Sequence, residues 1–462
     1  MRYIPHTPDD VARMLRACGA ASVEELFAGV PKRLRLARPL ALPPALSEPE
    51  LAAHLGDLAA RNVVPTGRAN SRGNGEALAF LGAGVHRHLA PAAQDLLLLR
   101  AEFYTSYTPY QPEISQGTLQ ATFEFQTIVA ELFGLDVANA SLYDGASAAA
   151  EAALMARRAT GRPRVVVSAG LHPEYRACCD AYLRGLAPDG SLVTVVPVDA
   201  SGATDLKALD RALSGDVACV IAQSPNFFGV IEDLEAVAKR ARAHGAMSIG
   251  ACAEPVALGL IRAPGEADCD IAIGEGLGLC GHTSLGGPGV GLFATRSAHV
   301  RSMPGRLVGE TVDAEGRRGY VLTLATREQH IRREKATSNI CTNQGLMALA
   351  FTINACLLGR RGLRELAEAN LAIAEYAKAR LTKIPGYALR FSGPTFNEFA
   401  LRVRGGDAAR VVQTLAVRGV VPGVSVGRFD ASLRDTLLIG VSELHRKADI
   451  DQLAAALAEF QP

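Results

Sequence analysis

From about residue 145 to residue 295, short β-branched runs alternate with amphipathic segments. The segment 233–245, for example, places Leu234, Val237 and Ala241 on one side of a helix. Such alternation is typical of βαβ units, whose crossovers are right-handed. The sequence therefore predicts an open, mainly parallel α/β sheet with helices on both faces. The runs predicted as strands are 164–170, 192–198, 217–223, 246–252, 270–274 and 290–295.

The regions on either side of this pattern differ from it. The first hundred residues read as helices and loops, with Thr7 before Pro8 and S-x-x-E capping pairs that start at Ser22 and Ser47. The Gly-rich stretch 65–90 is predicted to form loops over a core. After a long helix at 345–359 comes an α+β pattern: strand 396–403, helix 407–419, strand 435–443 and helix 447–460.

We therefore predict three parts: a helical N-terminal region (1–100), a large α/β domain (101–335) and a small α+β C-terminal domain (336–462). With 48% apolar residues, the chain is expected to be globular. Its net charge of +1 argues against binding to nucleic acid.

The remaining composition bears on location and metal binding. The nine cysteines lack CxxC spacing, and neither they nor the histidines have the spacing of a metal site. No signal pattern opens the sequence, and no apolar run approaches the roughly 20 residues of a membrane span. We expect a cytoplasmic protein without metal or membrane partner.

Polar residues that follow the predicted strands indicate a pocket, because ligands of open parallel sheets bind at the carboxyl ends of strands. Ser147 begins a helix, where amides and a hydroxyl suit an anion. His172 follows a strand and can stack on a flat ring. The alternative interpretations are a helix cap for Ser147 and a loop histidine for His172.

The segment SPNFFGVIEDLE (224–235), together with the adjoining stretch 236–259, resembles the core of fold type I pyridoxal-phosphate (PLP) enzymes. The resemblance covers the turn at Asn226, a helix, and a strand that ends in an acid, here Glu254. In that family an aspartate pairs with the pyridinium nitrogen of PLP. The resemblance implies a PLP-dependent transferase-like fold with a vestigial pocket at Ser147, His172, Asn226 and Glu254.

Such enzymes need a lysine, because only a primary amine forms the imine that holds PLP. The loop expected to carry it reads GEGLGLCGHTSLGGPGVG, and no lysine occurs between Lys239 and Lys335. Counting back from Pro288, the imine position is Leu277. This predicts a pocket without covalent cofactor. The alternative, a PLP enzyme that uses Lys335, requires that lysine to reach the pocket from far beyond the usual loop.

Other segments identify a narrower family. Residues 103–126, beginning FYTSYTPYQPEISQG, and 326–342, TREQHIRREKATSNICT, resemble segments of glycine decarboxylase, the P-protein of the glycine cleavage system. FLGAGVHRHLAP and MPGRLVGETVDAEGRRGY extend the resemblance over nearly the whole chain. It is similar to the first half of the single-chain enzyme, which is the alpha subunit (subunit 1) of the two-subunit form.

The resemblance implies an α2β2 heterotetramer in which the beta subunit (subunit 2) binds PLP. Glycine is decarboxylated there, and the aminomethyl group passes to the lipoyl arm of the H-protein. The enzyme is glycine dehydrogenase (aminomethyl-transferring), and this chain alone is expected to be inactive. The alternative function is a scaffold or regulatory pseudoenzyme that supports the partner without lining its site.

Two clusters carry the candidate catalytic residues. The first is a polar and aromatic loop that is punctuated by proline, and the second gathers cations that suit carboxylates or phosphates. The alternatives are a loop that only fixes the subunit interface and a solvated, salt-bridged helix face. His86 and His88 are weaker candidates. The residues are Tyr107, Tyr110, Gln111, Glu113, Ser115 and Gln116 in the first cluster, and Arg327, His330, Arg332, Arg333 and Lys335 in the second.

Overall fold

The computed structural model describes residues 5–66, 76–104, 107–187, 190, 192–281, 283 and 286–460. The chain divides into two compact units, Met1–Asn62 and Val63–Pro462. The boundaries predicted at residues 100 and 335 stay a prediction.

The first unit contains α1 (Pro8–Ala17) and α2 (Glu48–Ala59) with two short 3-10 turns between them, η1 (Val23–Phe27) and η2 (Lys32–Leu34). The predicted caps form. The Ser47 amide donates to the Glu50 carboxylate at 2.8 Å, and the amide of Glu25 donates to the Ser22 hydroxyl. Within this unit neither α1 nor α2 buries a side chain. Inside the unit, local capping therefore defines these helices more than packing does.

The second unit is built on a seven-stranded sheet in the order β3-β9-β8-β7-β6-β4-β5. Strands β4 to β8 are parallel, and β9 runs antiparallel to β8 with Ile271 opposite Thr295. All six predicted strands are confirmed. The bounds are β3 Val137–Ala138, β4 Arg164–Ser168, β5 Val193–Val196, β6 Val217–Gln223, β7 Met247–Cys252, β8 Ile271–Glu275 and β9 Gly291–Thr295.

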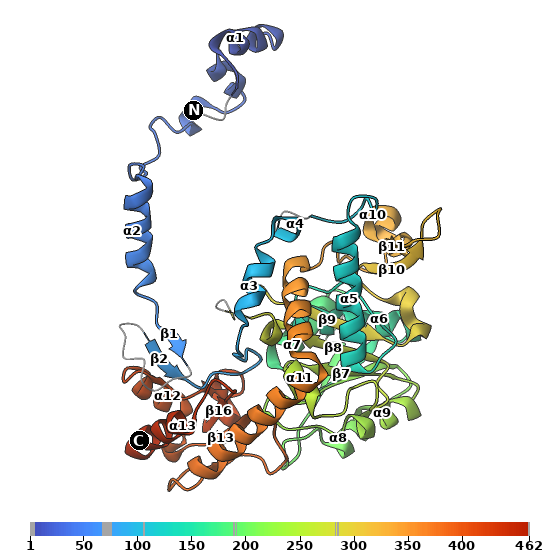
Figure 1. Ribbon diagram of the computed structural model, residues 1–462, viewed down its shortest axis with the longest axis vertical. Helices are drawn as coiled ribbons and strands as arrows, with labels where there is room; N and C mark the ends of the chain where they lie inside the picture. The colour runs from blue at the N-terminus through green and yellow to red at the C-terminus, as the bar shows by residue number, and fades with distance from the viewer. Residues whose placement is uncertain are drawn as a thin grey trace. The chain divides into compact units, whose positions relative to one another are not determined.

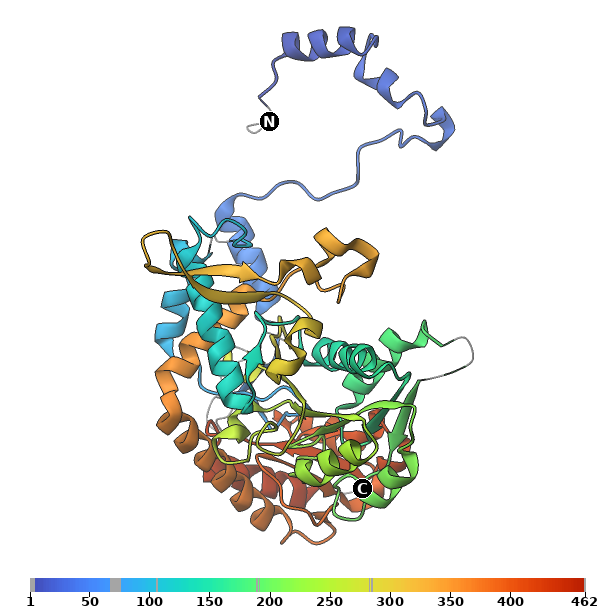
Figure 2. The same cartoon turned by 90° about the vertical axis from the view of Figure 1, so that its right-hand side faces the viewer.

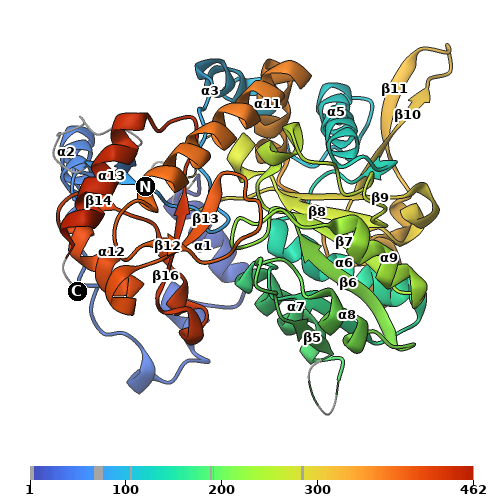
Figure 3. The same cartoon turned by 90° about the horizontal axis from the view of Figure 1, so that it is seen from below.

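Helices cover both faces of this sheet, as predicted (Figure 3). Val165 and Val167 of β4 pack toward the alanine-rich face of α6, whereas Val166 between them packs on the opposite side. Strand alternation thus sends successive residues into two cores. The covering helices are α5 (Gln116–Phe133), α6 (Gly145–Thr160), α7 (Pro173–Arg184), α8 (Leu206–Ala212) and α9 (Leu234–Ala243).

The long helix α11 (Gly345–Leu381) joins the sheet domain to the C-terminal domain (Figure 1). It changes direction at Gly359, whose φ of 60° is a left-handed value that favours glycine. By length and composition α11 passes a test for a membrane span. That test is weak, because buried core helices pass it too, and Phe351 and Ala367 of α11 lie in the hydrophobic core.

The C-terminal domain has a four-stranded sheet in the order β12-β13-β16-β15, with Phe399 and Ile439 in its core. The predicted strands and helices are confirmed. The bounds are β12 Ala388–Leu389, β13 Glu398–Arg402, α12 Ala408–Ala416, β14 Val420–Val421, β15 Val424–Ser425, β16 Thr436–Gly440 and α13 Lys447–Glu459.

The Gly-rich stretch 65–90 departs from the prediction of loops alone. It includes parts of two strands, β1 (Val64–Thr66) and β2 (Glu76–Ala79), and residues 67–75 lie outside the described part of the chain. β2 pairs with β14, and Leu78 and Phe80 enter the C-terminal core. The pairing partner lies far along the chain, so local sequence could not show it.

A hairpin of β10 (Leu307–Val312) and β11 (Arg318–Thr323) packs on α5 (Figure 2). Short elements complete the unit: α3 (Ala92–Leu98), α4 (Ala101–Tyr104), α10 (Gln329–Arg332), and the 3-10 turns η3 (Pro255–Gly259), η4 (Leu277–Leu279), η5 (Ser297–Ser302), η6 (Ala325–Arg327), η7 (Arg333–Lys335), η8 (Arg404–Gly406), η9 (Val426–Arg428) and η10 (Ala431–Leu433).

Candidate functional site

The polar loop before α5 lies at the surface. Tyr107 is 83% exposed and Tyr110 is 54% exposed, although both are large and aromatic. Gln111 and Glu113 are exposed as well. Exposed aromatic side chains on one loop are typical of a surface that binds a partner or a ligand.

The end of this loop is anchored to the hairpin. Ser115 is the N-cap residue of α5, and its side chain makes no capping bond. The side-chain amide of Gln116 donates to the Tyr320 carbonyl and accepts from the Tyr320 backbone amide, each at 2.8 Å. Gln116 therefore fixes α5 to β11, a structural contact that the sequence did not reveal.

Arg306, at the start of the hairpin, joins the two candidate clusters. Its guanidinium donates to the Tyr110 hydroxyl at 2.9 Å and to the Thr108 hydroxyl at 3.4 Å. Its Nε lies 3.7 Å from a Glu328 carboxylate oxygen and has no hydrogen-bond partner among the described residues. Only 5% of Arg306 is exposed. Arg306 belongs to the motif MPGRLVGETVD, but no local feature of the sequence indicates these contacts.

The predicted cation cluster is divided between the interior and the surface. Arg327 is buried and donates to the carbonyls of Met303, Gly305 and Leu324. Its burial lowers the pKa of its guanidinium. His330 lies on the exposed side, with its ring 6.2 Å from that of Tyr110. The other cations, Arg332, Arg333 and Lys335, are exposed.

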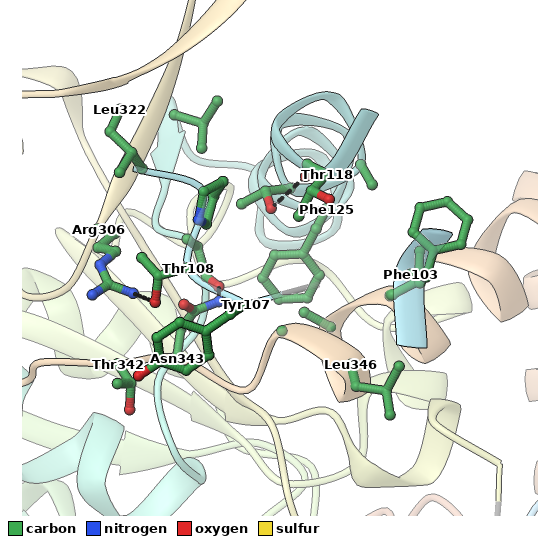
Figure 4. Close-up of a pocket in the computed structure, with 18 of the residues that line it drawn as sticks. Phe103, Tyr107, Thr108, Thr118, Phe125, Arg306, Leu322, Thr342, Asn343 and Leu346 are labelled. Carbon is green, nitrogen blue, oxygen red and sulfur yellow. Dashed lines mark hydrogen bonds between the residues drawn. The ribbon is translucent and has the colours of Figure 1, made fainter. Parts of the chain in front are cut away.

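A cavity of about 240 Å³ adjoins Arg306 (Figure 4). Its polar side carries Arg306, Thr108 and Asn343, and Figure 4 shows Phe103 and Leu346 across from them. A nearly buried guanidinium beside an open space is suited to bind a carboxylate, because its fork matches two carboxylate oxygens. The cavity thus combines a cationic end with an apolar end.

The second candidate site lies at the carboxyl ends of β4, β6 and β7, where four pocket residues were predicted. The backbone amide and the hydroxyl of Ser147 both bond the Asp144 carboxylate, in the capping box at the start of α6. Asn226 donates to Gly202 and Glu232 and accepts from two backbone amides of its own turn. Both side chains are therefore engaged within the chain, which fits the helix-cap alternative for Ser147.

His172 caps α7, and its Nε2 lies 2.9 Å from the Ala83 carbonyl oxygen. Glu254 follows β7 and is 3% exposed. One carboxylate oxygen of Glu254 lies 3.1 Å from His88 Nε2 and 3.7 Å from His86 Nδ1. The two histidines that the sequence ranked as weaker candidates are thus the partners of the predicted acid.

His88 is held between two carboxylates. Its Nδ1 lies 2.9 Å from Glu443, and its Nε2 faces Glu254. Burial lowers the pKa of His88, but Glu254 and Glu443 outweigh it and raise that pKa to about 10. Burial likewise raises the pKa of Glu254, but His88 and His86 lower it to about 2. The result is a buried ion pair.

These residues do not fit a lysine-bound PLP. Leu277, at the imine position, is buried and begins η4. Lys335 is exposed, and in the described structure it lines neither the small cavity at Glu254 nor the wider one at Glu275. Among described residues no group of three or more histidine, cysteine or acidic side chains is arranged to hold a metal ion.

Comparison with known proteins places the chain in a family. The profile described as "Glycine cleavage system P-protein" matches residues 1–457. A probable glycine dehydrogenase (decarboxylating) subunit 1 from Sorangium cellulosum is 52% identical over 464 residues, covering 100% of both chains. One from Anaeromyxobacter dehalogenans is 53% identical over 460 residues, covering 99% of this chain and 100% of that one.

Solved structures agree. A crystal structure of glycine decarboxylase (P-protein) of the glycine cleavage system, in inhibitor-bound form, matches with a TM-score of 0.87 and 44% identity, covering 99% of this chain and 100% of that one. A sphingosine-1-phosphate lyase from Burkholderia pseudomallei matches with a TM-score of 0.62 and 16% identity, over 93% and 94%. The second match shows the fold alone, and the fold type I prediction is confirmed.

The buried pair of His88 and Glu254 predicts how the free energy of unfolding depends on pH. The folded-state pKa of His88 lies above its ordinary 6.5, so its stabilisation is complete below about pH 6.5 and is lost as pH rises through about 10. The pKa of Glu254 lies below its ordinary 4.5, so its stabilisation is complete above about pH 4.5 and is lost as pH falls toward about 2. The contribution is largest between these limits.

Glu254→Gln keeps the shape of the side chain and removes its charge. In urea unfolding at about pH 6 we expect a loss of about 3–5 kcal/mol, because the variant leaves a buried imidazolium short of one partner. Glu365→Gln is the control, since its pair with Arg361 is exposed and is expected to contribute less than about 1 kcal/mol. Equal effects of the two substitutions would contradict a buried ion pair.

Proposed function

This chain belongs to the glycine cleavage system P-protein family, as subunit 1 of glycine decarboxylase, and we propose that it contributes residues to an active site whose PLP is bound by the partner subunit. Glycine is the substrate there. The aminomethyl group left after decarboxylation passes to the lipoyl arm of the H-protein. Two copies of each subunit form the α2β2 assembly.

One observation carries the proposal. The position that would supply the imine amine is Leu277, a buried hydrocarbon side chain. An enzyme of this reaction class needs that amine, because PLP supplies the electron sink for loss of carbon dioxide. A subunit without the amine can serve the reaction only beside a subunit that has it.

The Tyr110–Arg306 cluster is the surface that we assign to the shared site. It presents two tyrosines, an almost buried guanidinium and His330 within one patch. Arg306 orients the Tyr110 hydroxyl, and its charge suits the carboxylate of glycine or of a neighbouring residue. Gln111, Glu113, Arg333 and Lys335 are exposed polar groups on the same two chain segments. Their catalytic roles are part of the proposal.

The unit Met1–Asn62 supports a protein partner. Apolar side chains along it are exposed, including Leu51, Leu55 and Leu58 of α2 at 45%, 54% and 40%. Spacings of four and three residues put these leucines on one stripe of the helix. An exposed leucine stripe on a helix is a surface suited to binding a partner chain. We assign this stripe to subunit 2.

The alternative function is a scaffold that holds subunit 2 in its active form without lining the site. The exposed leucines of α2 favour both hypotheses equally. The polar patch separates them, because its substitution slows the reaction only if the patch lines the active site. We also propose a cytoplasmic location, consistent with nine unpaired cysteine thiols.

Glu113→Gln and Arg306→Lys test the shared site. In the reconstituted pair with H-protein, we expect each to lower glycine–bicarbonate exchange by about a hundredfold, because lost positioning near reacting atoms has effects of that size. Arg306→Lys keeps the charge but loses the fork that holds Tyr110 and Thr108. Gel filtration should show unchanged assembly. Full exchange in both variants, matching the Glu365→Gln control, would favour the scaffold.

The leucine stripe gives a separate prediction. Leu51→Glu with Leu55→Glu keeps helix propensity and places two charges on the stripe. We expect the affinity for subunit 2, measured by analytical ultracentrifugation, to fall at least about tenfold, since burial of a leucine contributes about 1.5–3 kcal/mol. Ala53→Glu, on the opposite side of α2, is the matched control. An unchanged affinity in the double variant would remove α2 from the interface.

A further inference from the structure

The segment Gly82–His88 runs through the place where a pocket over β7 would lie. His88 bonds Glu254, and its ring lies against Gly278: a Cβ added there would be 3.3 Å from His88 Cδ2. Gly278 directly follows Leu277, the imine position. An imidazole therefore occupies the space between the acid and that position.

The same segment contacts the ring of His172. Gly84 has a φ of +89°, and a Cβ added to it would lie 3.0 Å from His172 Cδ2. A positive φ and so close an approach of backbone to ring favour glycine. His172 Nε2 lies 2.9 Å from the Ala83 carbonyl oxygen, which fixes the contact. The Cδ2–Nε2 edge of His172 is thus engaged by the chain itself.

Little space remains between His172 and Glu254. The cavity bounded by Gly84, His86, His172, Asn226 and Glu254 measures about 10 Å³. A cavity needs about 10–15 Å³ to hold a single water molecule. A pyridine ring is several times larger, so the cavity cannot accept it.

The backbone amides where a cofactor phosphate would bind are also bonded to a side chain of the protein. The Gly145 amide, at the start of α6, donates to Glu275 at 3.0 Å, and the amides of Leu277 and Val290 donate to the other oxygen at 2.9 Å each. Glu275 is 8% exposed. A carboxylate thus receives the kind of backbone donors that bind a phosphate at a helix N-terminus.

The open space beside α6 does not restore a phosphate site. This cavity, about 570 Å³, is lined by Asp144, Glu174 and Glu275 and also by Arg87 and Arg428. A phosphate placed there would lack the Gly145 amide at the start of α6, because that amide already donates to Glu275.

From these contacts we infer that the cofactor pocket of subunit 1 is filled by its own chain: His88 stands in for the pyridinium ring and Glu275 for the phosphate. The filling also joins two domains. Glu254 and Glu275 belong to the sheet domain, whereas Asn397, beside Glu254, and Glu443, on His88, belong to the C-terminal domain. The network holds the two domains together without a ligand, so restoring the lysine alone does not restore cofactor binding.

Leu277→Lys tests the filled pocket. The variant is incubated with excess PLP, reduced with borohydride and mapped by peptide mass, with wild type as the control for surface lysines. We expect no labelling at position 277 above background. Near-stoichiometric labelling there would overturn the inference, because it would show that the lysine was all the pocket lacked.

Chemical rescue tests the ring position directly. His88→Gly leaves a gap beside Glu254, and we expect added imidazole, and also pyridine, to raise the melting temperature saturably by about 2 °C or more. Adding Glu254→Gln to the variant should abolish the rise. If His88→Gly folds only with imidazole present, that dependence counts as rescue. No rise with either base would overturn the placement of His88. Neither experiment involves subunit 2, so failure here leaves the proposed function to its own assay.

Discussion

A buried carboxylate at the end of β7 is stabilised by a cationic partner, and this chain supplies one as a histidine side chain. Glu254 is enclosed by protein, so leaving it unpaired would cost several kcal/mol. His88 meets the requirement, with Glu443 holding its other nitrogen. The path of residues 82–88, the approach of Gly84 to His172 and the contact between domains all accompany this pairing.

With the pocket filled in this way, the functional residues that we propose are those outside it. The two clusters of candidate catalytic residues lie on the loop before α5 and on the short turns beside the hairpin. Arg306 connects them, with one side toward Tyr110 and Thr108 and another toward Glu328. This arrangement suits a subunit that completes a site on a neighbour. The α/β fold is retained as a frame that positions the loop.

The sequence predicted the sheet because its strands are apolar runs rich in β-branched residues, as in Val165–Val167 and Ile271–Ile273. Its resemblance to fold type I PLP enzymes predicted the acid at Glu254, and the count back from Pro288 predicted Leu277 at the imine position. It could not predict the partner of the acid. Glu254 and His88 are 166 positions apart, and His88 and Glu443 are 355 apart. Such pairings are created only by the tertiary fold.

The same limit explains what was missed at the surface. Arg327 and Arg333 lie in the same charged segment, yet Arg327 donates to backbone carbonyls in the interior and Arg333 is exposed. Arg306 lies in a recognised motif without any local sign of its contacts. Strand β2 is short and pairs with β14, far along the chain, so its sequence alone did not distinguish it from the surrounding loop.

The central claim is that this chain carries no cofactor of its own and becomes active only with subunit 2. The most direct measurement is the visible absorbance and glycine–bicarbonate exchange of the purified chain, alone and with its partner, after saturation with PLP. The account predicts no cofactor band and no exchange for the chain alone, and both for the pair. A cofactor band from PLP covalently bound to this chain by itself would contradict it.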